Sequence, residues 1–394
     1  MRFYKKGNPK GRLIGRIAEY DLYPSILVPT IKSMPTEIGH HSVGDFNFSY
    51  GPSTGGLLES VRFLLLTPGE IIENVYVHAD YKLRTIELSG KSVEDALLLV
   101  ERINGFHSSS HSIAFLLAVE EALGITPDYE IQASRIIQIE LERIRSHLHV
   151  LSRMVEPAAF GVPFGFLNHL KERTSRLIGK YTGHRFFFGV NGLNSVAADF
   201  AGIHSDLMQI VEELKRLRKS LLSSRIFIDR LQGNGKIKEE TSTGPVARAS
   251  GYSFDARADS QSLPYSDQGF KPIIGFDGDA YERFMQRINE VEQSLELIEK
   301  MELYSKVNVK FTVNSQDSEE EKGTGIARIE SPSGDLTYLV VVDQQTIKKV
   351  NILTPSEINL PVFSKSMKGG VFTDFHFNWE SFGIWISELG VRII

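Results

Sequence analysis

Two histidines and an asparagine recur at helical spacing in the segment RINGFHSSSH, residues 102–111. Asn104, His107 and His111 follow one another at intervals of three and four residues, so a helical continuation would place them on one face. Gly105 lets the backbone approach a neighbour closely. The segment therefore predicts a polar cavity wall. The alternative is that its serines and asparagine cap the next helix by accepting hydrogen bonds from its first amides.

Imidazole nitrogens are also common zinc ligands, and this segment supplies two of them. The remaining polar residue, Asn104, is a weak ligand, and the sequence places no stronger third ligand nearby. We therefore expect no metal at this site.

A second set of charged residues occurs in RIIQIELERIRSHLHV, residues 135–150. Arg135, Glu140, Arg143 and His147 include pairs at three- and four-residue spacing, which is typical of ion pairs on an exposed helix face. The isoleucines and leucines between them need a face of their own, so both a surface role and an interior role stay open.

Two further segments have the composition of loops. GPSTGG, residues 51–56, lacks the lysine of a phosphate-binding loop and the full spacing of a dinucleotide fingerprint, which indicates a turn. TGPVARASGYSFDARAD, residues 243–259, has neither helical nor strand periodicity and is typical of an irregular loop that lines a site. A serine-nucleophile elbow is not found.

The composition excludes several classes of protein. A net charge of −5 over 394 residues gives no footprint for nucleic acid. The absence of cysteine excludes disulfides, thiolate metal sites and iron–sulfur clusters held by this chain. The longest apolar runs, such as FLLL, are far shorter than the ~20 residues of a membrane span, and the N-terminus does not resemble a signal peptide. We expect a soluble or peripheral protein on the cytosolic side.

The elements that must position these residues suggest an α+β fold. We expect an N-terminal β region over residues 1–90, a helical core over 91–310 and a C-terminal β hairpin and tail over 311–394. The core should contain about six helices. They are expected at residues 92–103, 112–124, 130–155, 166–183, 194–231 (as one helix or two) and 279–303. Residues 325–343 should form the hairpin, with SPSGD as its turn.

Six segments in order resemble one family. The chain is similar to the large subunit of membrane-bound, energy-converting [NiFe] hydrogenases and, equally, to the quinone-facing catalytic subunit of respiratory complex I. The resemblance runs from Phe46 to the C-terminus. It rests on KLRTIE (82–87), ERINGFHSSSHSIAFLLAVEEALGI (101–125), RIIQIELERIRSHL (135–148), GPVARASGYSFDARAD (244–259), GDAYERFMQRINEVEQSLELI (278–298) and ARIESPSGDLTYLVVVD (327–343).

The positions of the family's four metal-binding cysteines hold other residues in this chain. Asn104 and His107 occupy the first pair, and Trp385 and Glu388 the second. Trp cannot ligate a metal, and the other three cannot rebuild a bridged thiolate site. A nickel–iron centre is therefore excluded, and we expect these four residues to line the vacated cavity.

The resemblance to complex I is also partial. The loop that supplies a histidine to the quinone there reads GPSTGG here, with Gly51 and Gly55 at the two histidine positions. No tyrosine matches that histidine's partner. The expected proton donor is therefore His107 or Tyr81.

The resemblance further implies the surroundings of the site. Arg84, Glu87 and His111 should lie near a [4Fe–4S] cluster that an iron–sulfur small subunit holds, because this chain binds no cofactor itself. The residues expected around the cavity, or on a proton path to it, are Arg135, Glu140, Arg143, His147 and Glu156.

The function implied is that of the catalytic-type large subunit of a membrane-attached, complex I-like oxidoreductase. Electrons would pass from the small subunit to a quinone or similar acceptor, coupled to ion translocation, and any NADH oxidation would occur elsewhere. Expected partners are peripheral-arm subunits and membrane subunits of the antiporter-like and quinone-channel types, on the cytoplasmic side of the cell membrane. Two alternatives stay open: a hydrogenase-related energy-converting complex with a non-quinone acceptor, and a non-catalytic scaffold.

Overall fold

The computed structural model describes residues 46–394 except 238–240, 260–261, 306–307, 310–321 and 345. It also describes three N-terminal strands, β1 (Arg2–Tyr4), β2 (Gly15–Ile17) and β3 (Tyr20–Tyr23), which form an antiparallel sheet in the order β1-β3-β2. The rest of the expected N-terminal strand region before Phe46, and the acidic residues 315–321, lie outside the described residues.

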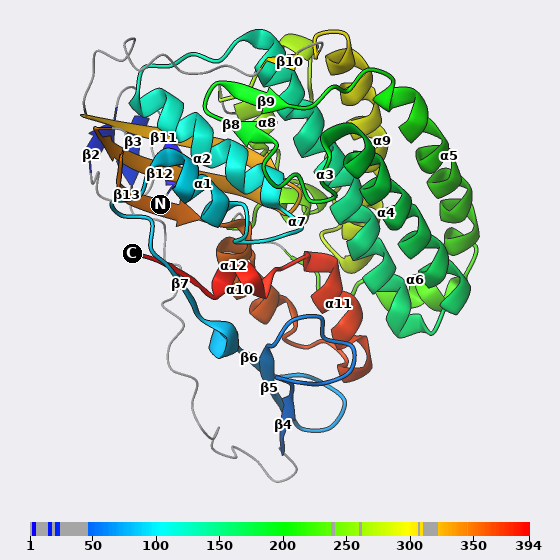
Figure 1. Cartoon of the computed structure of the whole chain (residues 1–394). Helices are drawn as coiled ribbons and strands as arrows, with labels where there is room; N and C mark the ends of the chain where they lie inside the picture. Colours follow the sequence, from blue (N-terminus) through cyan, green and yellow to red (C-terminus); the bar gives the residue numbers. More distant parts are fainter. Residues whose placement is uncertain are drawn as a thin grey trace.

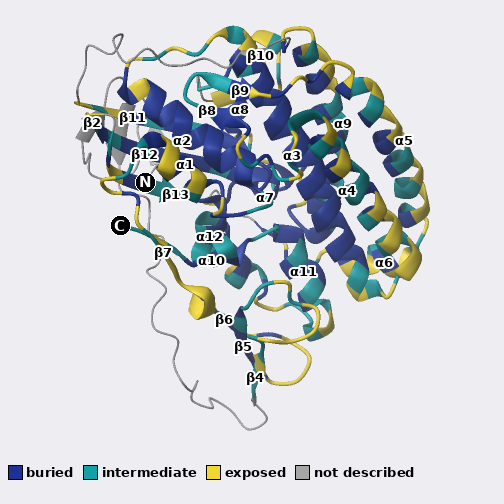
Figure 2. Ribbon diagram, in the orientation of Figure 1, coloured by how far each residue is buried: buried dark blue, intermediate teal, exposed yellow. Residues whose placement is uncertain are grey.

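Long helices form the bulk of the core (Figure 1). Helix α3 (Tyr129–Val155) packs against α4 (Gly161–Thr182) and α9 (Ala280–Glu302), and α5 (Ile203–Leu222) closes the group against α4 and α9. Helix α3 is buried along almost its whole length, whereas α5 has an exposed outer face (Figure 2). Helix α6 (Arg225–Leu231) follows α5, so the long pattern over 194–231 is two helices.

A second layer combines two helices with a sheet. Helix α1 (Val93–Val100) precedes α2 (Ser108–Ala122), and α2 packs on β11 (Lys322–Ser331) and β12 (Gly334–Asp343). Two glycines permit the close contact: a Cβ at Gly323 or Gly325 would meet a backbone oxygen of α2 at 1.7 or 1.9 Å. The predicted hairpin is confirmed, and a third strand, β13 (Thr346–Leu353), extends it.

The N-terminal and C-terminal parts of the chain meet in a third region. Strands β4 (Phe46–Tyr50), β5 (Arg62–Thr67) and β6 (Asn74–His78) form an antiparallel sheet. Strand β7 (Arg84–Ile86) pairs in parallel with β14 (Val391–Ile393), so residues more than three hundred positions apart run side by side. A 3-10 turn at Asp80–Lys82 separates β6 from β7.

Five helices lie where we expected only loop or tail. Helices α7 (Gly244–Ala249) and α8 (Ala256–Asp259) fall in the segment 243–259, which is therefore not an irregular loop throughout. Helices α10 (Pro355–Ser366), α11 (Phe375–Phe382) and α12 (Ile386–Leu389) replace the expected C-terminal tail. Short strands β8 (Asn191–Gly192), β9 (Ser195–Ala197) and β10 (Asn308–Val309) complete the described elements. The α+β class and the helical core are confirmed.

No helix in the described part of the chain combines the length and the apolar character that crossing a membrane requires.

Candidate functional site

The four residues at the family's cysteine positions lie together. Glu388, on α12, places its Oε1 2.9 Å from Asn104 Nδ2 and 2.9 Å from His107 Nδ1. The ring of Trp385, directly before α12, stands edge-on to the His107 ring at 5.4 Å. Asn104, His107 and Glu388 contact one another directly, so the side chains themselves occupy the space between them.

His111 extends this group. Its Nε2 lies 3.7 Å from Glu388 Oε1 and has no hydrogen-bond partner within the described residues, while its Nδ1 is 2.7 Å from the Tyr338 hydroxyl. We call Asn104, His107, His111 and Glu388 the His–Glu cluster. Each of its members is buried.

Hydrogen bonds keep the Glu388 carboxyl ionised. Burial alone would raise its pKa, but the hydrogen bond from His107 and the proximity of the His111 ring outweigh burial and lower the pKa well below its usual range. The Ser356 hydroxyl donates to Oε2 at 2.6 Å and itself accepts from the Trp385 amide. Both carboxylate oxygens of Glu388 therefore accept hydrogen bonds, Oε1 from Asn104 and His107 and Oε2 from Ser356.

Arg84 connects the two segments that carry the cluster. Its guanidinium donates to the carbonyl oxygens of Arg102, Ile103 and Ser387 at 3.0, 2.6 and 3.1 Å. These carbonyls immediately precede Asn104 and Glu388 in the chain. Together with the β7–β14 pairing, Arg84 fixes the distance between the two halves of the cluster.

The capping alternative for the serine run is wrong. The first amides of α2, those of Ser109 and Ser110, donate to the two carboxylate oxygens of Glu142 on α3 at 2.8 and 3.0 Å. The Ser108 hydroxyl donates instead to the Phe186 carbonyl, and Asn104 accepts from the Phe106 amide. A buried acid from another helix thus performs the role that the sequence suggested for the serines.

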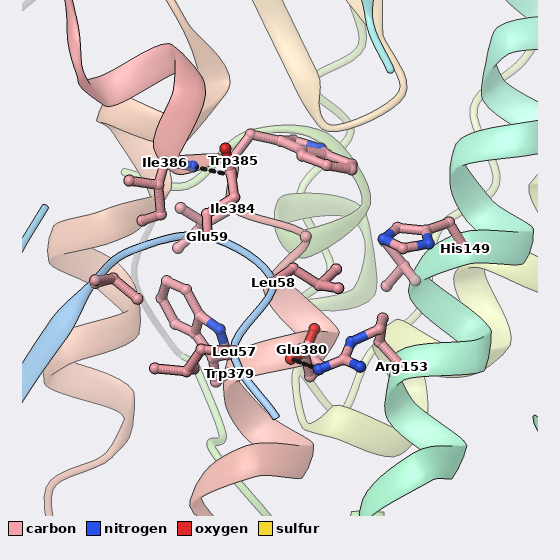
Figure 3. Close-up of a pocket in the computed structure, with 13 residues that line it drawn as sticks. Leu57, Leu58, Glu59, His149, Arg153, Trp379, Glu380, Ile384, Trp385 and Ile386 are labelled. Carbon is pink, nitrogen blue, oxygen red and sulfur yellow. Dashed lines mark hydrogen bonds and ion pairs between the residues drawn. The ribbon is translucent and has the colours of Figure 1, made fainter. Parts of the chain in front are cut away.

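A pocket lies beside the cluster, on the other side of Trp385 (Figure 3). It holds about 470 Å³ of empty space, part of it open to solvent. Its walls come from the segment after GPSTGG, from α3, and from the end of α11 and the chain that runs from there into α12. The residues that line it are Leu57, Leu58, Glu59, Val61, His149, Val150, Arg153, Trp379, Glu380, Gly383, Ile384, Trp385 and Ile386.

Three nitrogens of this pocket have no hydrogen-bond partner within the described residues: His149 Nδ1, Arg153 Nε and Trp385 Nε1. The three side chains are more than nine-tenths buried. Apolar walls with a few unpaired polar groups are typical of a ligand site.

One cation and two acids set the charge of the pocket. Arg153 pairs with Glu380 at 3.0 Å and with Glu156, and it donates to the Gly56 carbonyl. Glu59 accepts from the amides of Ile386 and Ser387. Burial raises the pKa of Glu59 and of Glu380, even though their hydrogen-bond partners oppose this. Burial also lowers the pKa of His149 to about 3, with help from the nearby charge of Lys171, so that its ring is neutral.

An aromatic stack separates the pocket from the His–Glu cluster. The rings of Phe106, His149 and Trp385 lie nearly parallel, with centroids 4.7 to 5.6 Å apart. His107 touches the far side of this stack through Trp385, so His107, Asn104 and Glu388 do not line the pocket. We expected all four replaced positions to border one cavity. Of these four residues, Trp385 lines the pocket and the other three do not.

Steric contact explains why the GPSTGG loop cannot carry a histidine at position 51. A Cβ on Gly51 would lie 2.0 Å from the Val61 carbonyl oxygen, and Gly51 has a φ of 92°. The neighbouring strand therefore excludes any larger residue from position 51. Gly55 has open space around it.

The charged residues of α3 are interior, so the surface interpretation of their pairs is wrong. Arg135 forks onto Glu120 at 2.7 and 2.6 Å, Arg143 pairs with Glu140, and His147 lies 2.8 Å from Glu290. The last two pairs join a buried group, which we call the core ion network. It comprises Glu140, Arg143, His147, Arg248, Asp255, Arg257, Glu290 and Glu330.

The remaining candidates lie at the surface or at the edge of the pocket. Tyr81 is exposed, and its ring packs against His78 and not against His107. Glu87 is exposed on the chain after β7. Glu156 is partly exposed and reaches the pocket through Arg153.

Sequence reasoning missed His149, Arg153, Glu59 and Glu380. One signal was present: His149 and Arg153 are four residues apart on α3, and His149 follows His147 by two, which turns it to a different face. Among the described residues, no group of three or more His, Asp or Glu is arranged to hold a metal ion.

The chain is similar to known subunits of membrane respiratory complexes. It is 26% identical to the D-type subunit of NADH-quinone oxidoreductase from Geobacter sulfurreducens, over 82% of this chain and 92% of that protein. It is 28% identical to the membrane-bound hydrogenase subunit alpha of Pyrococcus furiosus, over 74% of each. A chain in the structure of the membrane-bound sulfane sulfur reductase, an archaeal respiratory membrane complex, shares its fold with a TM-score of 0.80 at 20% identity, covering 88% of this chain and 98% of that one.

The family described as "Respiratory-chain NADH dehydrogenase, 49 Kd subunit" matches residues 161–305 and 300–390. These two ranges together exceed half of the chain, and they include α9, the β11–β13 sheet and the C-terminal helices. The resemblance inferred from the sequence motifs is confirmed: the chain belongs to this family of oxidoreductase-complex subunits.

Proposed function

We propose that this chain is the acceptor-binding subunit of a complex I-like oxidoreductase on the cytoplasmic side of a membrane. Electrons reach it from a [4Fe–4S] cluster in a neighbouring small subunit, and their passage to the acceptor is coupled to ion translocation by membrane subunits. The acceptor is a quinone or a similar uncharged ring, and it binds in the pocket between α3 and the segment before α12.

The observation that carries the proposal is the set of unpaired nitrogens in an apolar pocket. The indole N–H of Trp385 and the Nε–H of Arg153 are donors without acceptors, and the Nδ1 of His149 is also free to bond. A ring carbonyl is an acceptor that satisfies such groups, and Leu57, Leu58 and Ile384 supply the apolar contact.

The charge of the pocket favours a neutral ligand. Arg153 is already paired with Glu380 and Glu156, and Glu59 adds another acid. An anionic acceptor would meet these carboxyl groups, and the guanidinium of Arg153, the cation that lines the pocket, is already paired. A neutral ring meets no such cost.

The side chains around the pocket have three tasks in this scheme: to orient the acceptor, to shield it from water and to hold the neighbouring segments together. Trp385, His149 and Arg153 orient the acceptor, and the Phe106–His149–Trp385 stack shields its inner side from water. Arg84 holds the segments before Asn104 and Glu388 together at the edge where we expect the small subunit. The cluster of that subunit supplies single electrons.

His149→Leu tests the proposal in the intact complex. The variant keeps the apolar volume but removes the hydrogen-bonding nitrogen, so acceptor binding should weaken and KM for a short-chain quinone should rise about 10-fold, the equivalent of one hydrogen bond. Exposed His169 on α4 offers a matched control, His169→Leu. Equal KM values for the parent and His149→Leu would contradict the proposed pocket.

A non-quinone acceptor in a hydrogenase-related complex is the second candidate. Gly51 and Gly55 favour it, because the loop offers the acceptor no histidine at either position. A pure scaffold would gain nothing from an apolar pocket with unpaired donors, and such a role predicts a filled interior there.

A further inference from the structure

The His–Glu cluster contains a buried carboxylate with an unusual set of neighbours. Among the described residues, the basic groups within ion-pair distance of Glu388 are two imidazoles, His107 at 2.9 Å and His111 at 3.7 Å. An ionised carboxylate in the interior is costly unless a positive charge compensates it. A guanidinium would compensate it at every pH, whereas an imidazole does so only after it has taken up a proton.

The hydrogen bonds allow His107 to take up that proton without any movement of its ring. Its Nδ1 faces Glu388 Oε1, so the proton on Nδ1 is held by the carboxylate. Its Nε2 lies 3.3 Å from the Ser146 hydroxyl, which can either donate to Nε2 or accept from it. Protonation of Nε2 therefore requires only that the Ser146 hydroxyl rotate.

The charged and titratable groups around the cluster come from six directions. Among the described residues they include His111 on α2, His149 on α3, Tyr338 on β12, Glu357 on α10, Glu59 before β5 and Arg84 on β7. The two acids favour an added proton. Arg84 opposes it, but its guanidinium is directed at backbone carbonyls.

We infer that His107 and Glu388 form a proton-holding pair, which takes up one proton from water when the acceptor in the neighbouring pocket is reduced. This inference rests on the proposed function for its trigger. An electron from the carrier of the small subunit adds to the acceptor, and a water-derived proton binds the lone pair of His107 Nε2. The proton uptake forms that one N–H bond, and it offsets the charge that the electron brings.

The position of the pair supports this role. Trp385 borders the pocket with one face and contacts the His107 ring, so little more than one indole separates the two sites. Glu388 also lines a second groove, together with Asn351, Thr354 and Glu357.

The fluorescence of Trp385 measures the protonation of His107 directly. The chain has two tryptophans, so Trp379→Phe leaves Trp385 as the sole indole in the full-length protein. A protonated imidazole in contact with an indole quenches its fluorescence. Emission should therefore fall with a single midpoint as the pH drops from about 9 to about 5.

Variants in the Trp379→Phe background assign the response. Glu388→Gln removes the charge that holds the proton, so the midpoint should move to lower pH by about 1–3 units. Glu388→Asp retains the charge and should retain the response, and His107→Gln should abolish it. His149→Gln should leave it in place, because His149 stays neutral in this range.

A flat parent profile, or a midpoint that Glu388→Gln does not move while Glu388→Asp folds normally, would overturn the inference. So would a response that survives His107→Gln. The titration needs neither acceptor nor partner subunits, so its outcome is independent of the quinone assay with His149→Leu. Near-UV circular dichroism at neutral pH verifies that each variant is folded.

Discussion

The core ion network and the His–Glu cluster both bury carboxylates, but they compensate them differently. In the network, Arg248 alone contacts Asp255, Glu290 and Glu330 at 3.0, 2.8 and 2.6 Å, and Arg257 adds a pair with Asp255. In the cluster, Glu388 faces an amide, a hydroxyl and two imidazoles. Guanidinium charge is permanent, and imidazole charge depends on pH.

The difference separates a structural device from a functional one. The network joins α3, α7, α8, α9 and β11, five elements that come from distant parts of the chain. The guanidinium charges of Arg248 and Arg257 stay fixed there, although burial and the nearby Asp255 raise the pKa of the Glu330 carboxyl to about 7. The cluster lies beside the pocket and can change its proton count while its geometry stays the same.

Arg248→Met should have the largest effect on stability. The variant leaves three buried carboxylates without their shared cation, so the free energy of unfolding should fall by about 3–5 kcal/mol. Urea denaturation followed by circular dichroism measures the loss. Arg225→Met is the control, since Arg225 is exposed, pairs with the exposed Asp229 and should change stability by less than about 0.5 kcal/mol. A loss of similar size in both variants would remove the structural role of the network.

Glu290→Gln and Glu388→Gln compare the two regions directly. Both substitutions keep the side-chain shape and remove one buried charge. Glu290 neutralises Arg248, whose charge cannot be lost, so Glu290→Gln should cost about 3 kcal/mol or more at neutral pH. Glu388→Gln should cost about 1–2 kcal/mol, because the imidazoles can remain neutral and only the stronger charged hydrogen bonds are lost. Equal costs in the same urea assay would mean that the cluster is also a fixed ion pair.

Strong periodicity made the bundle predictable from the sequence, and weak periodicity hid the C-terminal helices. Helix α10 carries a capping box, in which the Thr354 side chain accepts from the Glu357 amide and Glu357 accepts from the Thr354 amide. The pattern TPSE shows this in the sequence, but we expected the segment to be part of the C-terminal tail; Pro361 lies inside the helix.

The site was predictable only in part, because its parts come from distant segments. The motif resemblance identified Asn104, His107, Trp385 and Glu388, and the structure places them in one region. The direct bonds from Asn104 and His107 to Glu388 fill the space that we expected to be a cavity. The pocket lies one side chain away and depends on how Glu59, His149 and Glu380 pack, which no local pattern encodes.

His149 lies between the His–Glu cluster and the pocket, and its lowered pKa should make the free energy of unfolding depend on pH. Burial lowers the pKa of His149 to about 3 from an ordinary value of 6.5, so the unfolded chain binds a proton that the folded chain rejects. Stability from this residue is present above pH 6.5 and declines as the pH falls below it. Between about pH 6.5 and 5.5 the loss should be about 1 kcal/mol, and His149→Gln should remove that part of the slope. Urea midpoints at the two pH values measure it, with exposed His169→Gln as the matched surface control. A slope that His149→Gln leaves unchanged would mean that this imidazole is charged beside the acceptor, and the fluorescence response of Trp385 could then no longer be assigned to His107 alone.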